Sequence, residues 1–233
     1  MGNFATKEII KNLHFQRNLK KLKISAENGD AQAMEKIGID FFRRVLYTHE
    51  FHLGSITNFK EKDEIDVFEG MLSAIYWFDR AVENGKIDSN YWIGETIDLY
   101  AYCGILGQSY YPAFFKEFLQ SDKCKRLFQE VFDSKKGYLY KIFEDEGIHF
   151  YDREDFYKKA AEAGNSSAAF RLGEIYLNYW FNDYYNHVKY NEPLTNYDYL
   201  NLAGKYLHHA FKKREPDVIT LIFKIFEKIE NIK

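Results

Sequence analysis

The segment Ala160-Ala161-Glu162-Ala163-Gly164-Asn165 decides the fold, because it recurs twice more along the chain. The other copies align with it without gaps, as Ser25-Ala26-Glu27-Asn28-Gly29-Asp30 and Ala81-Val82-Glu83-Asn84-Gly85-Lys86. A second glycine follows nine positions after the first in every copy, at Gly38, Gly94 and Gly173. Self-similarity of this kind predicts stacked copies of one structural unit.

Each repeated junction predicts the end of one helix and the start of the next. Glycine readily adopts the left-handed conformation that closes a helix, so Gly29, Gly85 and Gly164 are expected between helices. Asp30 and Asn165 follow directly and are good N-caps. Apolar residues then recur at spacings of three and four, which is typical of helices. No strand pattern bounded by turn dipeptides occurs, so we expect an all-α fold.

The second glycine of each copy lies inside a predicted helix, where glycine costs about 1 kcal/mol relative to alanine. That cost is acceptable where a neighbouring helix must approach closely. We therefore expect close helix contacts at Gly94 and Gly173.

Taken together, the copies fit the pattern A-x-x-W-Y-x-x-A-A-E-x-G-N-x-x-A-x-x-x-L-G-x-x-Y. This pattern resembles the Sel-one-like repeat, a relative of the tetratricopeptide repeat, and residues 74–85 and 156–165 follow it closely. The resemblance covers roughly half of the chain. It implies a short right-handed α-solenoid of helix pairs, a single domain over 1–233. The repeat cores are expected at about 5–44, 66–103, 153–178 and 195–232.

The chain also departs from that family pattern. Long loops are expected between Arg44 and Asp66 and between Asn178 and Thr195. Residues 104–152 form a predicted irregular helical insertion, with helices at 110–120, 122–132 and 138–146. The apolar run 218–232 is interpreted as a capping helix that closes the stack.

Composition and charge limit the classes of partner that we expect for this chain. The chain has 233 residues, a net charge of −3 and two cysteines. That charge gives no general attraction to nucleic acid or anionic membranes, and the basic stretch 17–23 is interpreted as a solvated helix face. Residues 1–12 lack an apolar signal region, and the longest uncharged run, 99–115, is short for a bilayer span. We expect a cytoplasmic protein with neither a nucleic-acid nor a membrane partner.

Residues that could carry chemistry form no recognisable motif. His49 and His52 offer two imidazoles but no third metal ligand nearby in the sequence. Cys124 lies between Lys123 and Lys125, a cationic neighbourhood that lowers the pKa of a thiol, but no histidine motif accompanies it. Phosphate-binding, dinucleotide-binding and paired-cysteine zinc motifs do not occur. We expect no cofactor, no metal site and no catalytic residue.

In tetratricopeptide-like stacks the first helix of each pair lines the concave side. The resemblance therefore places a partner-binding surface on the helices that begin near Asp30, Ile87 and Asn165. The candidate residues are Glu35, Arg43, Asp88, Tyr91, Glu95, Asp98, Phe170, Glu174 and Asn178, with Trp180 from the aromatic run Tyr179 to Tyr185. Acidic and aromatic side chains dominate, which favours a basic protein partner. Two alternatives stay open: the set is only a solvated face, and the aromatic run folds back to cover the stack.

The resemblance implies adaptor or scaffold work, which is non-catalytic protein binding through an extended surface. Richness in Phe, Tyr, Ile, Lys and Asn suits an AT-rich bacterial genome. Within this class we favour an immunity-type protein that neutralises one dedicated toxin, because such a role would explain irregular repeats and an acidic groove. A generic signalling or regulatory adaptor is the alternative, and an enzyme built on an α-solenoid is a third class.

Overall fold

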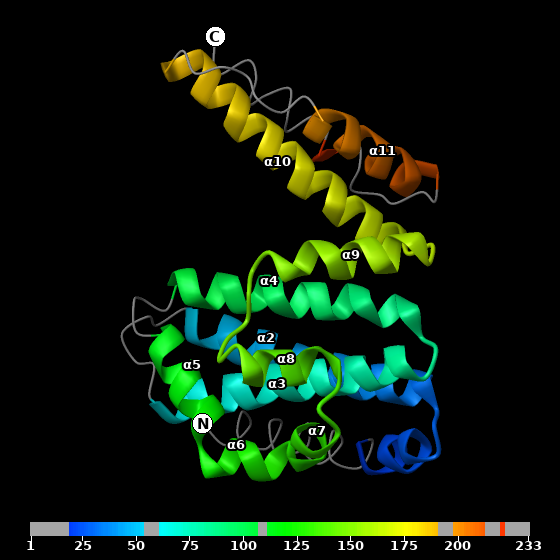
Figure 1. Ribbon diagram of the computed structural model, residues 1–233, viewed down its shortest axis with the longest axis vertical. Coiled ribbons are helices and arrows are strands. Elements are labelled where there is room, and N and C mark those ends of the chain that lie inside the picture. Colours follow the sequence, from blue (N-terminus) through cyan, green and yellow to red (C-terminus); the bar gives the residue numbers. More distant parts are fainter. Residues whose placement is uncertain (1–18, 54–60, 107–110, 191–197, 213–219, 222–233) are drawn as a thin grey trace, which may run out of the picture. The chain divides into compact units, whose positions relative to one another are not determined.

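The computed structural model describes residues 19–53, 61–106, 111–190, 198–212 and 220–221. Helices dominate these residues, and no strand occurs among them (Figure 1). The all-α prediction is therefore confirmed for the described chain. The chain divides into two compact units, Met1–Arg153 and Glu154–Lys233. The assignment of both to one repeat domain stays a prediction.

All three junction glycines close a helix in the same way. Their φ angles are 87° at Gly29, 90° at Gly85 and 97° at Gly164. In each junction the glycine N–H donates to the carbonyl three residues back, and the next N–H donates to the carbonyl five residues back, at 2.9 to 3.2 Å. This is the Schellman arrangement, which satisfies carbonyls that the helix end would leave unpaired. The predicted position of these glycines between helices is confirmed.

The predicted N-caps are confirmed as well. Asp30 Oδ1 accepts hydrogen bonds from the N–H groups of Gln32, at 3.0 Å, and Ala33, at 3.1 Å. Asn165 Oδ1 accepts from the N–H of Ala168 at 2.9 Å. The middle junction has Lys86 at this place, whose side chain makes no capping hydrogen bond. There a 3-10 turn, η2 (Ile87–Ser89), precedes the next α-helix.

Helix α3 is the centre of the first unit. The helices of this unit are residues 19–27, α2 (Ala31–Leu53), α3 (Glu61–Glu83), α4 (Asn90–Leu106), α5 (Tyr111–Gln120), α6 (Asp122–Leu127), α7 (Gln129–Ser134) and α8 (Gly137–Glu144). Helix α3 contacts α2, α4, α5 and α8, and α2 lies along it in Figure 1. Its buried side chains therefore face several neighbours: Val67, Phe68, Met71, Leu72, Ala74, Ile75, Trp77, Phe78 and Ala81.

Two of the mid-helix glycines mark close helix contacts. A Cβ atom placed on Gly38 would lie 2.4 Å from the ring of Phe78 in α3. A Cβ atom on Gly173 would lie 2.5 Å from the side chain of Leu207. No side chain larger than hydrogen fits at either position without a shift of the neighbour. The expected close approach at Gly173 is confirmed, and Gly94 is buried.

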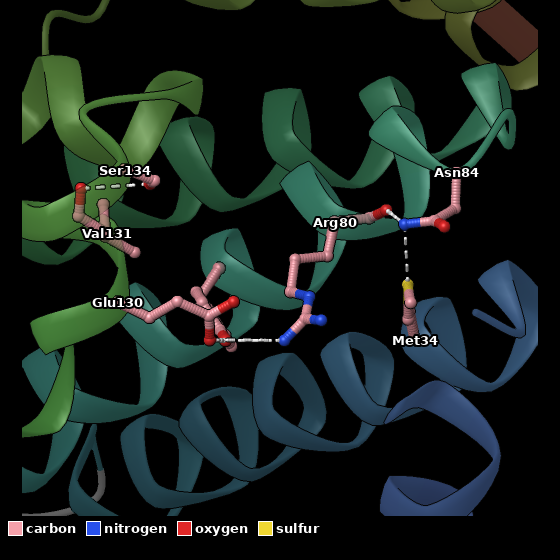
Figure 2. Close-up of polar contacts among 7 residues, drawn as sticks. Met34, Arg80, Asn84, Glu130, Val131 and Ser134 are labelled. Atoms are coloured by element: carbon pink, nitrogen blue, oxygen red, sulfur yellow. Dashed lines mark hydrogen bonds and ion pairs between the residues drawn. The ribbon is translucent and has the colours of Figure 1, made fainter. Parts of the chain in front are cut away.

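The short helix α7 is tied to α3 by a polar cluster, which Figure 2 shows together with contacts to α2. Tyr76 donates its hydroxyl hydrogen to Glu130 Oε2 at 2.6 Å and accepts from Arg80 at 2.8 Å. Arg80 also lies 3.4 Å from Glu130. Four residues after Arg80, just beyond the end of α3, Asn84 Nδ2 donates to the Met34 sulfur in α2 at 3.6 Å. Polar contacts near the C-terminal end of α3 thus link it to both α7 and α2.

The second unit is built from α9 (Asp152–Glu162, whose first two residues precede the boundary), α10 (Ser166–Tyr190) and α11 (Asp198–Lys212). Helices α10 and α11 pack against each other through tyrosines. The ring of Tyr176 stacks on Tyr199 at 6.1 Å and on Tyr206 at 5.9 Å between centroids. Ala203 and Ala210 are buried on α11, so small residues and aromatic rings share this interface.

Both predicted long loops are wrong over much of their length, because the flanking helices continue through them. Helix α2 extends to Leu53 and α3 begins at Glu61. Of the first expected loop, residues 54–60 lie outside the described chain. Helix α10 continues to Tyr190 and includes the aromatic run. Rings four residues apart stabilise it as a helix, since Trp180 stacks on Tyr184 at 5.3 Å.

The insertion is helical, as expected, but its middle helix is broken. The predicted helix 122–132 divides at Phe128, whose φ of −117° and ψ of 28° leave the helical range. The hydroxyl of Ser121 accepts from the N–H of Cys124 at 3.1 Å and caps the first piece. The predicted capping helix 218–232 lies outside the described residues except for 220–221.

Candidate functional site

The start of α4 is fixed against α2 by one carboxylate. Glu35 Oε1 accepts from the hydroxyl of Ser89 at 3.0 Å, and Glu35 Oε2 lies 3.3 Å from the ammonium of Lys86. The Glu35 side chain is only 14% exposed. Glu35, a predicted partner-binding residue, therefore already holds two contacts inside the first unit, and these contacts position the start of α4.

The inner side of α4 is fixed by apolar packing. Ile93, Ile97 and Leu99 are buried. The ring of Trp92 stacks on Phe78 at 6.2 Å and meets Phe42 edge-on at 5.7 Å. Because this side is committed to the core, the rotation of α4 about its axis is set, and so is the identity of its outer residues.

The outer side of α4 brings together four of the predicted residues. The spacings of three and four place them on one helix face, together with a fifth residue that the prediction missed. We name this face the α4 stripe: Asp88, Tyr91, Glu95, Asp98 and Tyr102. Its first four residues are half-buried, and Tyr102 is 50% exposed. The stripe carries three carboxylates and two phenol rings along η2 and α4.

The end of the stripe is held by an ion pair. The guanidinium of Arg153 lies 2.6 Å from Asp98 Oδ1, and the Arg153 side chain is 12% exposed. Its Cζ atom sits 3.4 Å from the ring centroid of Phe150. Phe150 in turn meets the ring of Tyr151 at 6.0 Å between centroids, and Tyr151 is 76% exposed, so exposed aromatic rings lie next to a largely buried ion pair. Aromatic and arginine side chains are the residue types that carry most binding energy at protein interfaces.

Arg43, the one cation among the predicted residues, lies apart from these carboxylate contacts. It is exposed on α2 and lines a hollow with Lys21, Lys36 and Asp40. Arg43 therefore has two basic neighbours there, Lys21 and Lys36.

The remaining predicted residues belong to the second unit, on α10. Phe170, Glu174 and Asn178 are four residues apart and share one side of this helix. Glu174 pairs with Arg171 at 3.1 Å, and Asn178 is exposed. Trp180 follows Gly173 by seven positions and Tyr176 by four, so it shares the side of α10 that packs against α11. The structure therefore separates Trp180 from the other three.

Cys124 does not have the activated thiol that its lysine neighbours indicated. The side chain is buried, and burial, followed by the nearby Glu69 carboxylate, raises the pKa of the Cys124 thiol to about 12. Lys123 pairs with Glu69 at 2.6 Å instead of facing the sulfur. The expectation of a lowered pKa is wrong, because exposure of the sulfur could not be read from the sequence.

Sequence reasoning missed four residues of this surface: Tyr102, Phe150, Tyr151 and Arg153. The signal for Tyr102 was available, because it continues the spacing of the stripe by four positions. The pairing of Asp98 with Arg153 joins residues 55 positions apart and had no local signal.

Within the described part of the chain, no helix combines the length and apolar character needed to cross a bilayer, and no three potential metal ligands gather. A scan against protein-family models finds no match, and searches of curated proteins and of solved structures find none.

Proposed function

We propose that this chain is a non-catalytic protein-binding module of the Sel-one-like, tetratricopeptide-like class, and that its α4 stripe contacts a basic protein partner. The observation that carries the proposal is the stripe itself. Carboxylates and phenol rings follow one another on a helix whose opposite side is locked in the core. The packing of that opposite side holds the backbone of the surface in place before binding, which lowers the entropic cost of association.

Two kinds of side chain divide the work of binding in this proposal. The carboxylate of Asp88 steers a basic partner toward the surface, an effect that weakens as salt rises. Tyr102 and Tyr151 supply exposed ring area that is buried on contact. Because each unit has its own irregular elements rather than identical repeats, we assign the module to one dedicated partner in the bacterial cytoplasm. An immunity-type protein that neutralises a toxin is the specific role we propose.

The first experiment identifies the partner. A photo-crosslinking amino acid replaces Tyr102 in the full chain, expressed in its own cells. The matched control places it at Leu127 on α6, which is 49% exposed against 50% for Tyr102. We expect one discrete protein adduct from position 102 and none from position 127. Equal adducts from both positions, or none from either, would contradict a specific surface on α4.

The second experiment measures association with that captured partner by stopped-flow or surface plasmon resonance. Asp88→Lys should slow association at low salt, and Tyr102→Ala should mainly speed dissociation. Glu117→Lys makes the same charge change at an exposed position on α5 and should leave the rates unchanged. For the immunity role, the wild-type chain should restore growth to cells expressing the captured protein, and Asp88→Lys should restore less. A captured protein that is harmless to cells would leave binding in place and remove the immunity role.

A further inference from the structure

A hollow of about 450 Å³ lies between the helix of residues 19–27 and α2. Six of the described residues line it: Lys21, Leu22, Lys36, Ile39, Asp40 and Arg43. The volume is within the range of small-ligand and peptide pockets. None of these residues belongs to the α4 stripe, so the hollow is a separate surface.

The hollow is positive in a chain whose net charge is −3. Three cationic side chains line it, against the single carboxylate of Asp40. Burial raises the pKa of Asp40, and the positive charge of Arg43 opposes this rise only in part. The three cationic side chains outnumber the Asp40 carboxylate, so positive charge dominates the described lining of the hollow.

The floor of the hollow is apolar. Leu22 packs against the buried cluster that contains Ile37 and Trp77, and Ile39 is half-buried. A ligand that fills this site must present negative charge to its rim and an aliphatic group to its floor. An acidic peptide with an interposed aliphatic residue has both.

We propose that this hollow binds an acidic peptide segment of a partner protein. Carboxylates of the peptide pair with Lys21, Lys36 and Arg43, and an aliphatic side chain lies against Leu22 and Ile39. A single-stranded nucleic acid would need aromatic rings on which its bases stack, and none of the six lining residues is aromatic. Free phosphate would use the cations and leave the apolar floor empty.

The test uses the full chain and a labelled, terminally blocked pentapeptide, Glu-Glu-Leu-Glu-Glu, with fluorescence anisotropy as the readout. Lys21→Glu and Arg43→Glu should each weaken binding by about tenfold. Asp40→Asn should strengthen it, because a like charge leaves the site. Lys23→Glu is the matched control: Lys23 is exposed on the same helix but does not line the hollow. It should leave the affinity within about twofold.

Several results would overturn the inference. The inference is wrong if the acidic peptide does not bind, or if the peptide Lys-Lys-Leu-Lys-Lys binds more tightly. It is also wrong if Lys23→Glu weakens peptide affinity as much as Lys21→Glu does, or if Asp40→Asn does not raise that affinity. Full competition by inorganic phosphate or by a single-stranded oligonucleotide at the peptide's own concentration would assign the hollow to those anions instead. Matching circular dichroism melts must accompany each variant. Asp88→Lys, on the α4 stripe, should not change peptide affinity, so this test fails or succeeds independently of the proposed function.

Discussion

Asp79, in α3, caps the start of α8 from outside that helix: its Oδ2 atom accepts a hydrogen bond from the N–H of Leu139 at 2.8 Å. The residue at the usual capping position, Lys136, makes no side-chain cap. Gly137 makes the approach possible, because a Cβ atom there would lie 2.8 Å from the same oxygen and its φ is 80°. The position of Asp79 on α3 therefore helps to determine where the short helix α8 begins.

Replacing Asp79 by alanine should lower the free energy of unfolding by about 1–2 kcal/mol, because the N–H of Leu139 loses its charged acceptor. Urea denaturation followed by circular dichroism measures the change. Asp133→Ala is the control, since Asp133 is exposed and accepts a hydrogen bond from Gln129 within the same short helix. It should shift stability by less than about 0.5 kcal/mol. Equal effects of the two changes would remove the capping role of Asp79.

Two glycines in the second unit should respond to substitution with opposite signs. Gly173→Leu should destabilise by roughly 1–3 kcal/mol, because even its Cβ atom meets Leu207. Gly204, on α11, has nothing within 4 Å of its Cβ position. Gly204→Ala should therefore stabilise by up to about 1 kcal/mol through helix propensity alone. Thermal melts of both variants check the signs, and a stabilising Gly173→Leu would contradict the close packing of α10 and α11.

Asp30 should make the stability of the fold depend on pH in the acid range. The hydrogen bond from the Ser25 hydroxyl, and then that from the N–H of Ala33, hold the pKa of Asp30 below its ordinary value of 3.8. A carboxyl whose pKa is depressed by folding stabilises the fold above its unfolded pKa and loses that effect as pH falls through the folded value. The melting temperature of the wild type should thus fall on acidification below about pH 4. Asp30→Asn should lose less over that window, and an identical pH profile would show that Asp30 does not contribute.

Substitutions of Asp98 and of Arg153 should have strongly non-additive effects on the free energy of unfolding, because the two side chains form one ion pair. Asp98→Asn leaves a mostly buried guanidinium without its charge partner and should cost about 1–3 kcal/mol. The double variant Asp98→Asn/Arg153→Met should cost less than the two single changes added together. Lys116→Met breaks the exposed pair with Glu146 and should cost under about 1 kcal/mol. Additive effects at Asp98 and Arg153 would mean that the contact carries no energy of its own.

The parts of the fold that could be predicted are those fixed within a few residues. The glycine closures and the caps at Asp30 and Asn165 depend on backbone conformation and on groups at most five positions apart. The mid-helix glycines showed that a neighbour comes close, but not that the neighbours are Phe78 and Leu207. Those contacts depend on packing between distant segments.

The prediction failed where helices continue past their expected ends. The aromatic run in α10 has no regular apolar spacing, yet ring stacking such as Trp180 on Tyr184 stabilises it as helix. The grouping of residues on the outer side of α4 was likewise predictable only in part. Helical spacing found Asp88, Tyr91, Glu95 and Asp98, whereas the partner of Asp98 lies 55 positions away.

The central place of α3 has a consequence for hydrogen exchange. Its amides lie under side chains from α2, α4, α5 and α8, so local fraying cannot expose residues such as Phe68, Ile75 and Phe78 to solvent. Their amide hydrogens exchange only when the whole first unit opens, at a rate set by its global stability. Deuterium uptake in α3 is therefore a direct measure of that unit's free energy of unfolding, while the short helices α6 and α7 report its partial openings.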